Sequence, residues 1–149
     1  RDIDAIQLGQ GVRVCAFTEM LVQHRARHSP VEGGLILGDA VLISTGCNIR
    51  AAGGVIRVGP HSGIGQLCVL VAANHSIKPG VPRFHTPWDD IKCGVEIGAN
   101  VWVGANCTIL LGARIGDNAV IAAGSVVRGE VPAGELWGGV PARYIKTIE

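Results

Sequence analysis

The chain has few aromatic residues and no long hydrophobic run. Only 4% of its 149 residues are Phe, Trp or Tyr, although 48% are hydrophobic. A core of this composition consists of small aliphatic groups in a narrow space, which suits a solenoid better than a globule. No apolar stretch approaches the roughly 20 residues of a membrane span, and the length fits a single domain.

An excess of charge of either sign is also missing. Thirteen Lys and Arg residues stand against twelve Asp and Glu residues, which gives a formal net charge of +1. Such a chain has no strong field to attract nucleic acid or an anionic membrane surface. We therefore expect neither of these partners.

The cysteines lack the spacing of a zinc site or a disulfide framework. They are odd in number and never closer than fourteen residues apart: Cys15, Cys47, Cys68, Cys93 and Cys107. We expect reduced thiols that serve as small apolar groups in a cytoplasmic protein. The sequence starts at Arg1 without a visible signal peptide, and we expect its native start to be missing.

What the chain does contain is a six-residue repeat. Aliphatic residues recur every six positions from Ile97 to Val127. An earlier series runs from Leu37 to Val55 and restarts at Val58, three residues out of phase. A helix needs a period near 3.6 and a half-buried strand a period of 2, so this repeat indicates a chain that turns a corner every six residues. Three hexads then make one triangular coil of short parallel strands.

The repeat divides the expected single domain (1–149) into segments. In chain order we expect an irregular cap with an incomplete first coil (1–36), coils (37–73), an excursion loop (74–94), further coils (95–130) and a C-terminal cap (131–149). The cap is expected to include a short helix from Ala142 to Ile148. Ordered loops as long as the excursion loop are uncommon in compact repeats and usually functional.

Three segments carry a family resemblance: Ala72-Ala73-Asn74-His75, the run from Val95 to Ala105, and Gly138-Gly139-Val140-Pro141-Ala142-Arg143. Together they resemble the hexapeptide-repeat acyltransferases, and within them the galactoside, maltose and surface-polysaccharide O-acetyltransferases. The resemblance covers roughly 37–148. It implies an all-β fold, a left-handed parallel β-helix, against the usual right-handed rule for parallel crossovers. It also implies a homotrimer whose acetyl-CoA sites lie between neighbouring subunits.

His75 stands where the regular coil gives way to the excursion loop. Imidazole titrates near neutrality and can take the proton of an attacking hydroxyl. The resemblance implies this role for His75, in a direct attack of the acceptor on acetyl-CoA that requires no cysteine nucleophile. It also implies that the backbone N–H of Ala105 stabilises the oxyanion. From spacing alone, an ordinary loop histidine and an ordinary ladder amide remain open.

Candidates for the acceptor side are Asn48, Asn74, His85, Trp88 and Trp102. Trp102 is too large for the coil interior and should point outward, toward the site or a neighbouring subunit. Asn48 lies near an acceptor-binding asparagine of the sugar enzymes, although asparagine also suits coil corners. His85 and Trp88 could shape the acceptor pocket or pack against a neighbouring subunit. The acidic N-terminal acceptor contact of the galactoside and maltose enzymes has no visible counterpart.

Acetyl-CoA carries phosphate groups, so its site should end in cations and backbone donors. The resemblance implies this role for Arg128, Arg143 and Lys146, while Ala105 and Ala123 would line the pantetheine arm. The alternative for the C-terminal cations is that they serve solubility.

The sequence therefore predicts an acetyl-CoA-dependent O-acetyltransferase that needs no metal and acts on a sugar or a polysaccharide precursor. Three alternatives stay open. One is an N-acetyltransferase acting on an amino sugar. Another is a γ-class carbonic anhydrase, which places three histidines on a metal ion between subunits. The third is a solenoid that serves as an assembly platform without catalysis.

Overall fold

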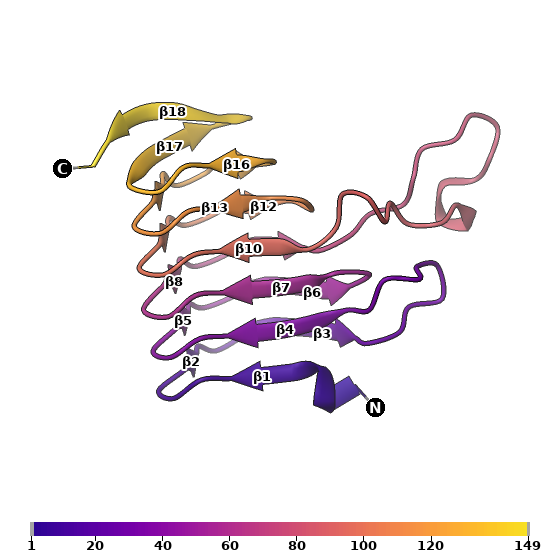
Figure 1. Cartoon of the computed structure of the whole chain (residues 1–149), viewed down its shortest axis with the longest axis horizontal. Helices are drawn as coiled ribbons and strands as arrows, with labels where there is room; N and C mark the ends of the chain where they lie inside the picture. The colour runs from indigo at the N-terminus through magenta and orange to yellow at the C-terminus, as the bar shows by residue number, and fades with distance from the viewer. Residues whose placement is uncertain (1, 149) are drawn as a thin grey trace.

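The computed structural model describes residues 2–148, which form a stack of triangular coils (Figure 1). Each strand of a coil pairs in parallel with the strands of the coils above and below, so that three sheets form the three walls. The fold is the left-handed parallel β-helix that the resemblance implied. Two elements depart from this pattern: the excursion loop and the antiparallel hairpin at the C-terminal end.

The three walls are called sheets A, B and C in the order in which the chain visits them. Sheet A contains β1 (Ile6–Leu8), β4 (Gly34–Leu37), β7 (Val55–Val58), β10 (Val95–Ile97), β13 (Arg114–Ile115) and β16 (Glu130–Val131). Sheet B contains β2 (Arg13–Val14), β5 (Leu42–Ile43), β8 (Gly63–Ile64), β11 (Trp102–Val103), β14 (Val120–Ile121), β17 (Glu135–Gly139) and β18 (Ala142–Thr147). Sheet C contains β3 (Glu19–Gln23), β6 (Asn48–Ala52), β9 (Val69–Val71), β12 (Thr108–Ile109) and β15 (Val126–Val127). The 3-10 helices are η1 (Asp2–Ala5) and η2 (Arg83–His85).

The aliphatic residues of the six-residue repeat form the core, as the period predicts. Each wall contributes a column of buried side chains, for example Ile43, Ile64, Val103 and Ile121 on sheet B. One residue of the predicted series is an exception. Val55 is only half-buried, whereas Ile56 and Val58 point into the core.

Two of the three corners are uniform along the stack. The connection from sheet A to sheet B (the AB corner) and the connection from sheet B to sheet C (the BC corner) each take four residues in the regular coils. The third of these four residues has a positive φ, as in Asn100, Asn106 and Asn118. Asparagine and glycine adopt this left-handed conformation at the lowest cost. Corner side chains also bond between coils, as the Asn100 amide does with Asn118 Oδ1 at 2.8 Å.

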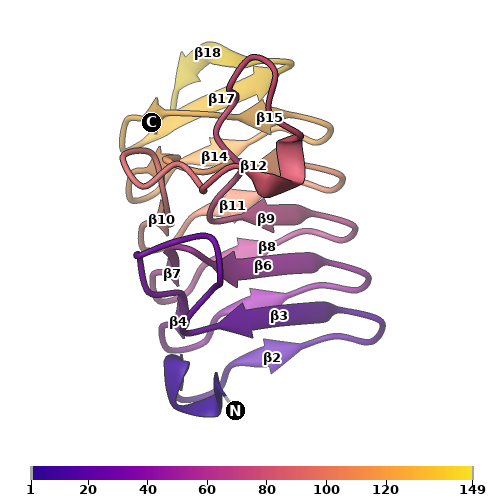
Figure 2. The same cartoon turned by 90° about the vertical axis from the view of Figure 1, so that its right-hand side faces the viewer.

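The third corner, from sheet C to sheet A (the CA corner), varies strongly. It comprises residues 24–33, 53–54, 72–94, 110–113 and 128–129 in successive coils. The excursion loop is the largest of these insertions and projects from one edge of the prism (Figures 1 and 2). The phase slip before Val58 arises at the same corner, because Gly53 and Gly54 separate β6 from β7.

Two sequence predictions about the ends of the chain were wrong. The first coil is complete, since Leu8, Val14 and Met20 continue the six-residue repeat on β1, β2 and β3. At the other end, Ala142–Thr147 form strand β18 instead of a helix. This segment pairs antiparallel with β17 and so covers a sheet edge that would otherwise expose unpaired backbone groups.

Candidate active site

The two ends of the excursion loop are tied together around His75. An antiparallel bridge joins His75 to Trp88, and the Ser76 N–H donates to Pro87 O at 2.9 Å. The Asp89 N–H donates to Asn74 O, also at 2.9 Å. Thr86 is fully buried beneath this bridge, and its hydroxyl lies 2.7 Å from Ser76 O. These bonds fix the backbone on either side of the histidine.

Hydrogen bonds to both ring nitrogens define the state of His75. Nδ1 lies 2.7 Å from the carbonyl oxygen of Thr86, and the indole N–H of Trp88 donates to Nε2 at 2.9 Å. Because a carbonyl only accepts, Nδ1 carries the proton and Nε2 presents its lone pair. The ring is therefore a neutral imidazole whose Nε2 is the basic atom, as a general base requires.

A hollow of about 520 Å³ lies beside His75 on the outer face of sheet C. It extends across β3, β6 and β9 toward the excursion loop. Its lining combines apolar strand residues with a few polar groups: Leu21, Gln23, Arg50, Ala52, Val71, Ala73, Asn74, His75 and Trp88. The structure thus brings three predicted site residues, Asn74, His75 and Trp88, to one concave surface.

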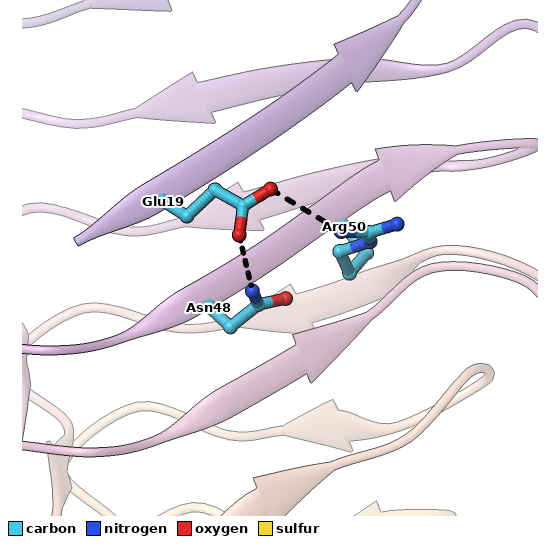
Figure 3. A network of polar contacts seen from close by, with 3 residues as sticks. All are labelled: Glu19, Asn48 and Arg50. Carbon is cyan, nitrogen blue, oxygen red and sulfur yellow. Dashed lines mark hydrogen bonds and ion pairs between the residues drawn. The ribbon is translucent and has the colours of Figure 1, made fainter.

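Asn48 belongs to a polar network on the same face (Figure 3). Its side-chain amide donates to Glu19 Oε2 at 3.1 Å, and Arg50 Nη1 lies 3.5 Å from Glu19 Oε1. Arg50 reaches the hollow, whereas Asn48 lies two residues before it on β6. Glu19 therefore places an acidic group from the N-terminal coil beside Asn48, although the sequence showed no counterpart for such a contact.

Sequence reasoning missed several residues near His75. The ring of His28 lies 5.4 Å from that of His75, and Phe84 approaches it edge-on at 5.8 Å. Glu19, the partner of Asn48 and Arg50, was also overlooked, because residues 1–36 were interpreted as an irregular cap. The spacing of Leu8, Val14 and Met20 would have revealed β3, and with it the wall on which Glu19 stands.

Not every concave surface belongs to this site. His85 lines a separate hollow of about 360 Å³ with Arg27, His28 and Pro87. A larger groove, about 660 Å³, follows the outer face of sheet A and lies away from His75. It is open and carries charged groups on successive strands, such as Arg57, Glu96 and Arg114. We therefore place the candidate site by its chemistry and not by the size of a groove.

The candidates for the pantetheine side lie on a different edge of the prism. Ala105 and Ala123 belong to the BC corner, whereas His75 belongs to the CA corner. Backbone hydrogen bonds at the BC corner run from the N–H groups of Gly104 and Asn106. Within the described residues, the Ala105 N–H makes no such bond. This amide therefore has a free donor.

Trp102 points outward from sheet B, as its size predicted, and remains 49% exposed. Its indole lies over Gly63 of the neighbouring strand β8, where a Cβ would come within 2.7 Å of Trp102 Cζ3. A glycine on the adjacent strand therefore provides the room for the ring.

The predicted phosphate-binding cations lie at the C-terminal end of the stack. Arg128 and Arg143 line a small hollow of about 50 Å³ together with Glu130. Lys146 is exposed on β18, opposite Leu136 of β17. These cations and His75 therefore lie in separate parts of the chain's surface.

The cysteines do not contribute to the candidate site. All five are free, and three are buried at the same position of successive BC corners. Cys47, Cys68 and Cys107 donate to the carbonyl oxygens of Gly65, Gly104 and Ala122 on the next coil. Hydrogen bonds from Cys107 and Cys47, together with burial, raise the pKa of the Cys68 thiol. The Cys68 thiol, held protonated, is a poor nucleophile, and none of the three cysteines lines the hollow beside His75.

Residues 2–148 contain neither a candidate membrane-spanning helix nor a clustered metal site. None of the helices there is both long and apolar enough to span a membrane. Nor does this part of the chain bring three or more His, Cys, Asp or Glu side chains together as a metal site.

Sequence comparison finds relatives along the repeat. Residues 94–129 match the family described as bacterial transferase hexapeptide (six repeats). YvoF of Bacillus subtilis (strain 168), whose name assigns it provisionally to the acetyltransferases, is 53% identical over 95 residues, 63% of this chain and 49% of that protein. The galactoside O-acetyltransferase of Escherichia coli (strain K12) is 46% identical over 54 residues, 36% of this chain and 27% of the enzyme. The chain thus spans about half the length of YvoF and a smaller share of the galactoside O-acetyltransferase.

Solved structures extend the likeness over nearly the whole chain. The hexapeptide-repeat acetyltransferase VCA0836 of Vibrio cholerae, solved with acetyl-CoA, matches with a TM-score of 0.76 at 27% identity, over 97% of this chain and 72% of that one. A variant of the N-acyltransferase AntD of Bacillus cereus matches with a TM-score of 0.80 over 98% and 74% of the two chains; at 20% identity it shows the fold alone. Residues 94–129 thus match the repeats of this transferase family, and over nearly its whole length the chain is similar to a hexapeptide-repeat acetyltransferase.

Proposed function

We propose that the protein is an O-acetyltransferase that moves an acetyl group from acetyl-CoA to a hydroxyl of a sugar or polysaccharide precursor. The observation that carries this proposal is the geometry of His75. Its Nδ1–H is directed at Thr86 O, which leaves Nε2 as the basic atom beside a hollow of suitable size. A hydroxyl needs such a base because it is a weak nucleophile while it retains its proton.

In the proposed reaction, Nε2 of His75 takes the proton of the acceptor hydroxyl as its oxygen attacks the thioester carbonyl carbon. The carbonyl oxygen becomes an oxyanion and accepts a hydrogen bond from the Ala105 N–H. When the intermediate collapses, the C–S bond breaks and the leaving thiolate takes from His75 the proton that came from the acceptor hydroxyl. The bond from Nδ1 to Thr86 O holds the ring in one orientation throughout.

We place the complete site between two copies of the chain in a homotrimer. Within one chain, His75 and Ala105 lie on the CA and BC corners, at opposite edges of sheet C. A neighbouring copy that presents its BC corner to His75 would bring the two halves together. Arg128, Arg143 and Lys146 would then bind the phosphates of acetyl-CoA, with Ala123 and Trp102 along its pantetheine arm. Acetyl-CoA in the VCA0836 structure supports the choice of acyl donor.

The hollow on sheet C is the proposed acceptor site. Trp88 offers an aromatic plane to a sugar ring, and Asn74, Gln23 and Arg50 offer polar contacts. Asn48 and Glu19 extend this polar surface along the wall, and His85 would contact only an acceptor that extends to the next hollow. We place the reaction in the cytoplasm, where the five free thiols would stay reduced.

The test is a screen of acceptors in which release of free CoA thiol from acetyl-CoA is measured. Mono-, di- and oligosaccharides are compared with amino sugars and sugar nucleotides, so that transfer to nitrogen is also detected. We expect His75→Ala to keep its far-UV circular dichroism and oligomeric state and to lose about a hundredfold in kcat, the usual contribution of a general base. Near-normal turnover by this variant would refute the proposed mechanism.

A further inference from the structure

Trp88 forms a hydrogen bond to Nε2 of His75, the atom that acts as the base in the proposed reaction. The indole N–H donates to Nε2 at 2.9 Å, while Nδ1 is engaged with Thr86 O at 2.7 Å. The two rings meet edge to face, with centroids 5.7 Å apart. In this arrangement the lone pair of Nε2 already has a donor, so a hydroxyl cannot bond to it until the indole moves.

Insertions of three successive coils converge on Trp88. The first insertion, 24–33, supplies the carbonyl of His28, which accepts the Trp88 backbone N–H at 2.8 Å. The second coil, which has three extra residues between Ile49 and Val58, supplies Gly53, and the third insertion carries Trp88 itself. Each insertion lies at the CA corner. The phase slip of the repeat, to which the proposed function gives no role, therefore places Gly53 against Trp88.

Gly53 forms the surface on which the indole lies. A Cβ built on this glycine would overlap Trp88 Cε3 and come within 2.7 Å of Cζ3. Gly53 also has a φ of +64°, a backbone conformation that non-glycine residues other than Asn and Asp seldom adopt. The space beneath the indole thus requires glycine, the positive φ favours it, and the extra residues of this coil create the position that the ring fills.

We propose that Trp88 is a positioning residue that caps Nε2 of His75 and is displaced by the acceptor. Its indole nitrogen marks where the acceptor hydroxyl binds, because both groups donate one hydrogen bond to the same lone pair. In the absence of acceptor, the cap keeps water from Nε2 and so suppresses hydrolysis of acetyl-CoA. This inference rests on the proposed role of His75 and adds a requirement to it: an acceptor must replace the indole to react.

The test measures the accessibility of Nε2 without using turnover. Diethyl pyrocarbonate acylates the unprotonated nitrogen of histidine, and peptide mass spectrometry reports the rate at His75. Trp88→Phe keeps an aromatic ring at this position and removes the N–H donor together with part of the ring area, a loss that the control variant below shares. We expect this variant to react about fivefold faster or more, the factor that one net hydrogen bond provides. An unchanged rate at His75 would overturn the proposal.

Trp137→Phe is the matched control. It removes an indole N–H that bonds to Glu135 at 2.7 Å, on β17 and away from His75, and should leave the rate at His75 unchanged. Gly53→Ala tests the same contact by changing the surface on which the indole lies. If this variant melts as the wild type does, it should also accelerate modification of His75, because its methyl group displaces the indole. A rate like that of the wild type in such a folded variant would contradict the proposed contact.

A kinetic comparison separates this inference from the proposed function. Trp88→Phe should hydrolyse acetyl-CoA faster than the wild type when no acceptor is present, while Trp137→Phe should not. Normal turnover by His75→Ala would refute the proposed function but leave the modification rates as a test of the cap. Faster modification without faster hydrolysis would overturn the role of the cap in excluding water.

Discussion

The AB and BC corners of the prism differ from the CA corner in almost every respect. The AB and BC corners repeat the same four-residue turn with a positive φ at the third position. The CA corner varies from two residues at 53–54 to the long excursion loop at 72–94 and carries His75, Trp88 and the contacts around them. The length of one corner can therefore vary from coil to coil, because the pairing of strands in the three walls does not depend on that corner.

Each side of this comparison contains a tryptophan that lies over a glycine. Trp102 covers Gly63 on the regular wall of sheet B, and Trp88 covers Gly53 at the variable corner. The first pair follows from strand register, since Trp102 and Gly63 are aligned partners on β11 and β8. The second depends on residues inserted into different coils. Similar packing thus arises by a regular rule in one region and by a local exception in the other.

The largest expected effect comes from breaking the regular side. Ile109 on β12 is fully buried, and Ile109→Asp would place a carboxylate in the aliphatic column. We expect a loss of several kcal/mol in the free energy of unfolding, because a buried charge without a partner is strongly unfavourable. Urea denaturation followed by circular dichroism measures it.

The control for this substitution is its neighbour. Thr108→Asp introduces the same carboxylate on the half-buried outward position of the same strand. It should change the free energy of unfolding by less than about 1 kcal/mol, as surface substitutions usually do. Equal destabilisation by the two variants would contradict the assignment of inward and outward positions.

A smaller effect on stability is expected at the variable corner. Thr86→Val removes the hydroxyl that lies 2.7 Å from Ser76 O and leaves the buried volume nearly unchanged. The loop around His75 should loosen while the coils stay intact, because local opening can occur without global unfolding. We expect kcat to fall about tenfold, part of the contribution of a positioned base, with a change in Tm below about 5 °C.

Thr45→Val at a BC corner tests whether this effect belongs to the loop. Thr45 is exposed and does not line the hollow beside His75, so neither kcat nor Tm should change appreciably. A fall in Tm for Thr86→Val that matches that of a core variant would show that the loop and the coils unfold together. The separation between the two regions would then be wrong.

The same contrast explains what the sequence could predict. The walls were predictable because one rule, an inward aliphatic residue every six positions, applies to residues such as Ile97, Val103 and Ile109 without reference to anything distant. The position of His75 was also visible, as the place where this rule stops. Its hydrogen bonds to Thr86 and Trp88 were not, since they depend on how an irregular loop folds back on itself.

The wrong predictions also have physical causes. The first coil was predicted as incomplete because its repeat includes Met20 and is followed at once by an insertion, so too few hexads stand in a row to reveal the period. The C-terminal segment was predicted as a helix because its local pattern does not decide between helix and strand. The edge of β17 decides, since pairing with Ala142–Thr147 satisfies backbone groups that a helix would leave open.

In the proposed site, the CA corner of one copy supplies His75 and the BC corner of another supplies the Ala105 N–H. A variant at Ala105 tests the BC half. Ala105→Pro would delete the backbone N–H assigned to the oxyanion. Proline suits this position, because Pro60 precedes the positive-φ residue His61 at an AB corner just as Ala105 precedes Asn106. The variant should therefore keep the coil and lose the donor.

The most direct measurement is the turnover of mixed oligomers assembled from His75→Ala and Ala105→Pro subunits. Each variant alone should be nearly inactive. In a random trimer at equal ratio, about a quarter of the sites would pair an intact His75 with an intact Ala105 from the next copy, so about a quarter of the wild-type rate should return. If each chain instead holds a complete site, mixing restores nothing, and activity no higher than that of the separate variants would contradict a site shared between two corners.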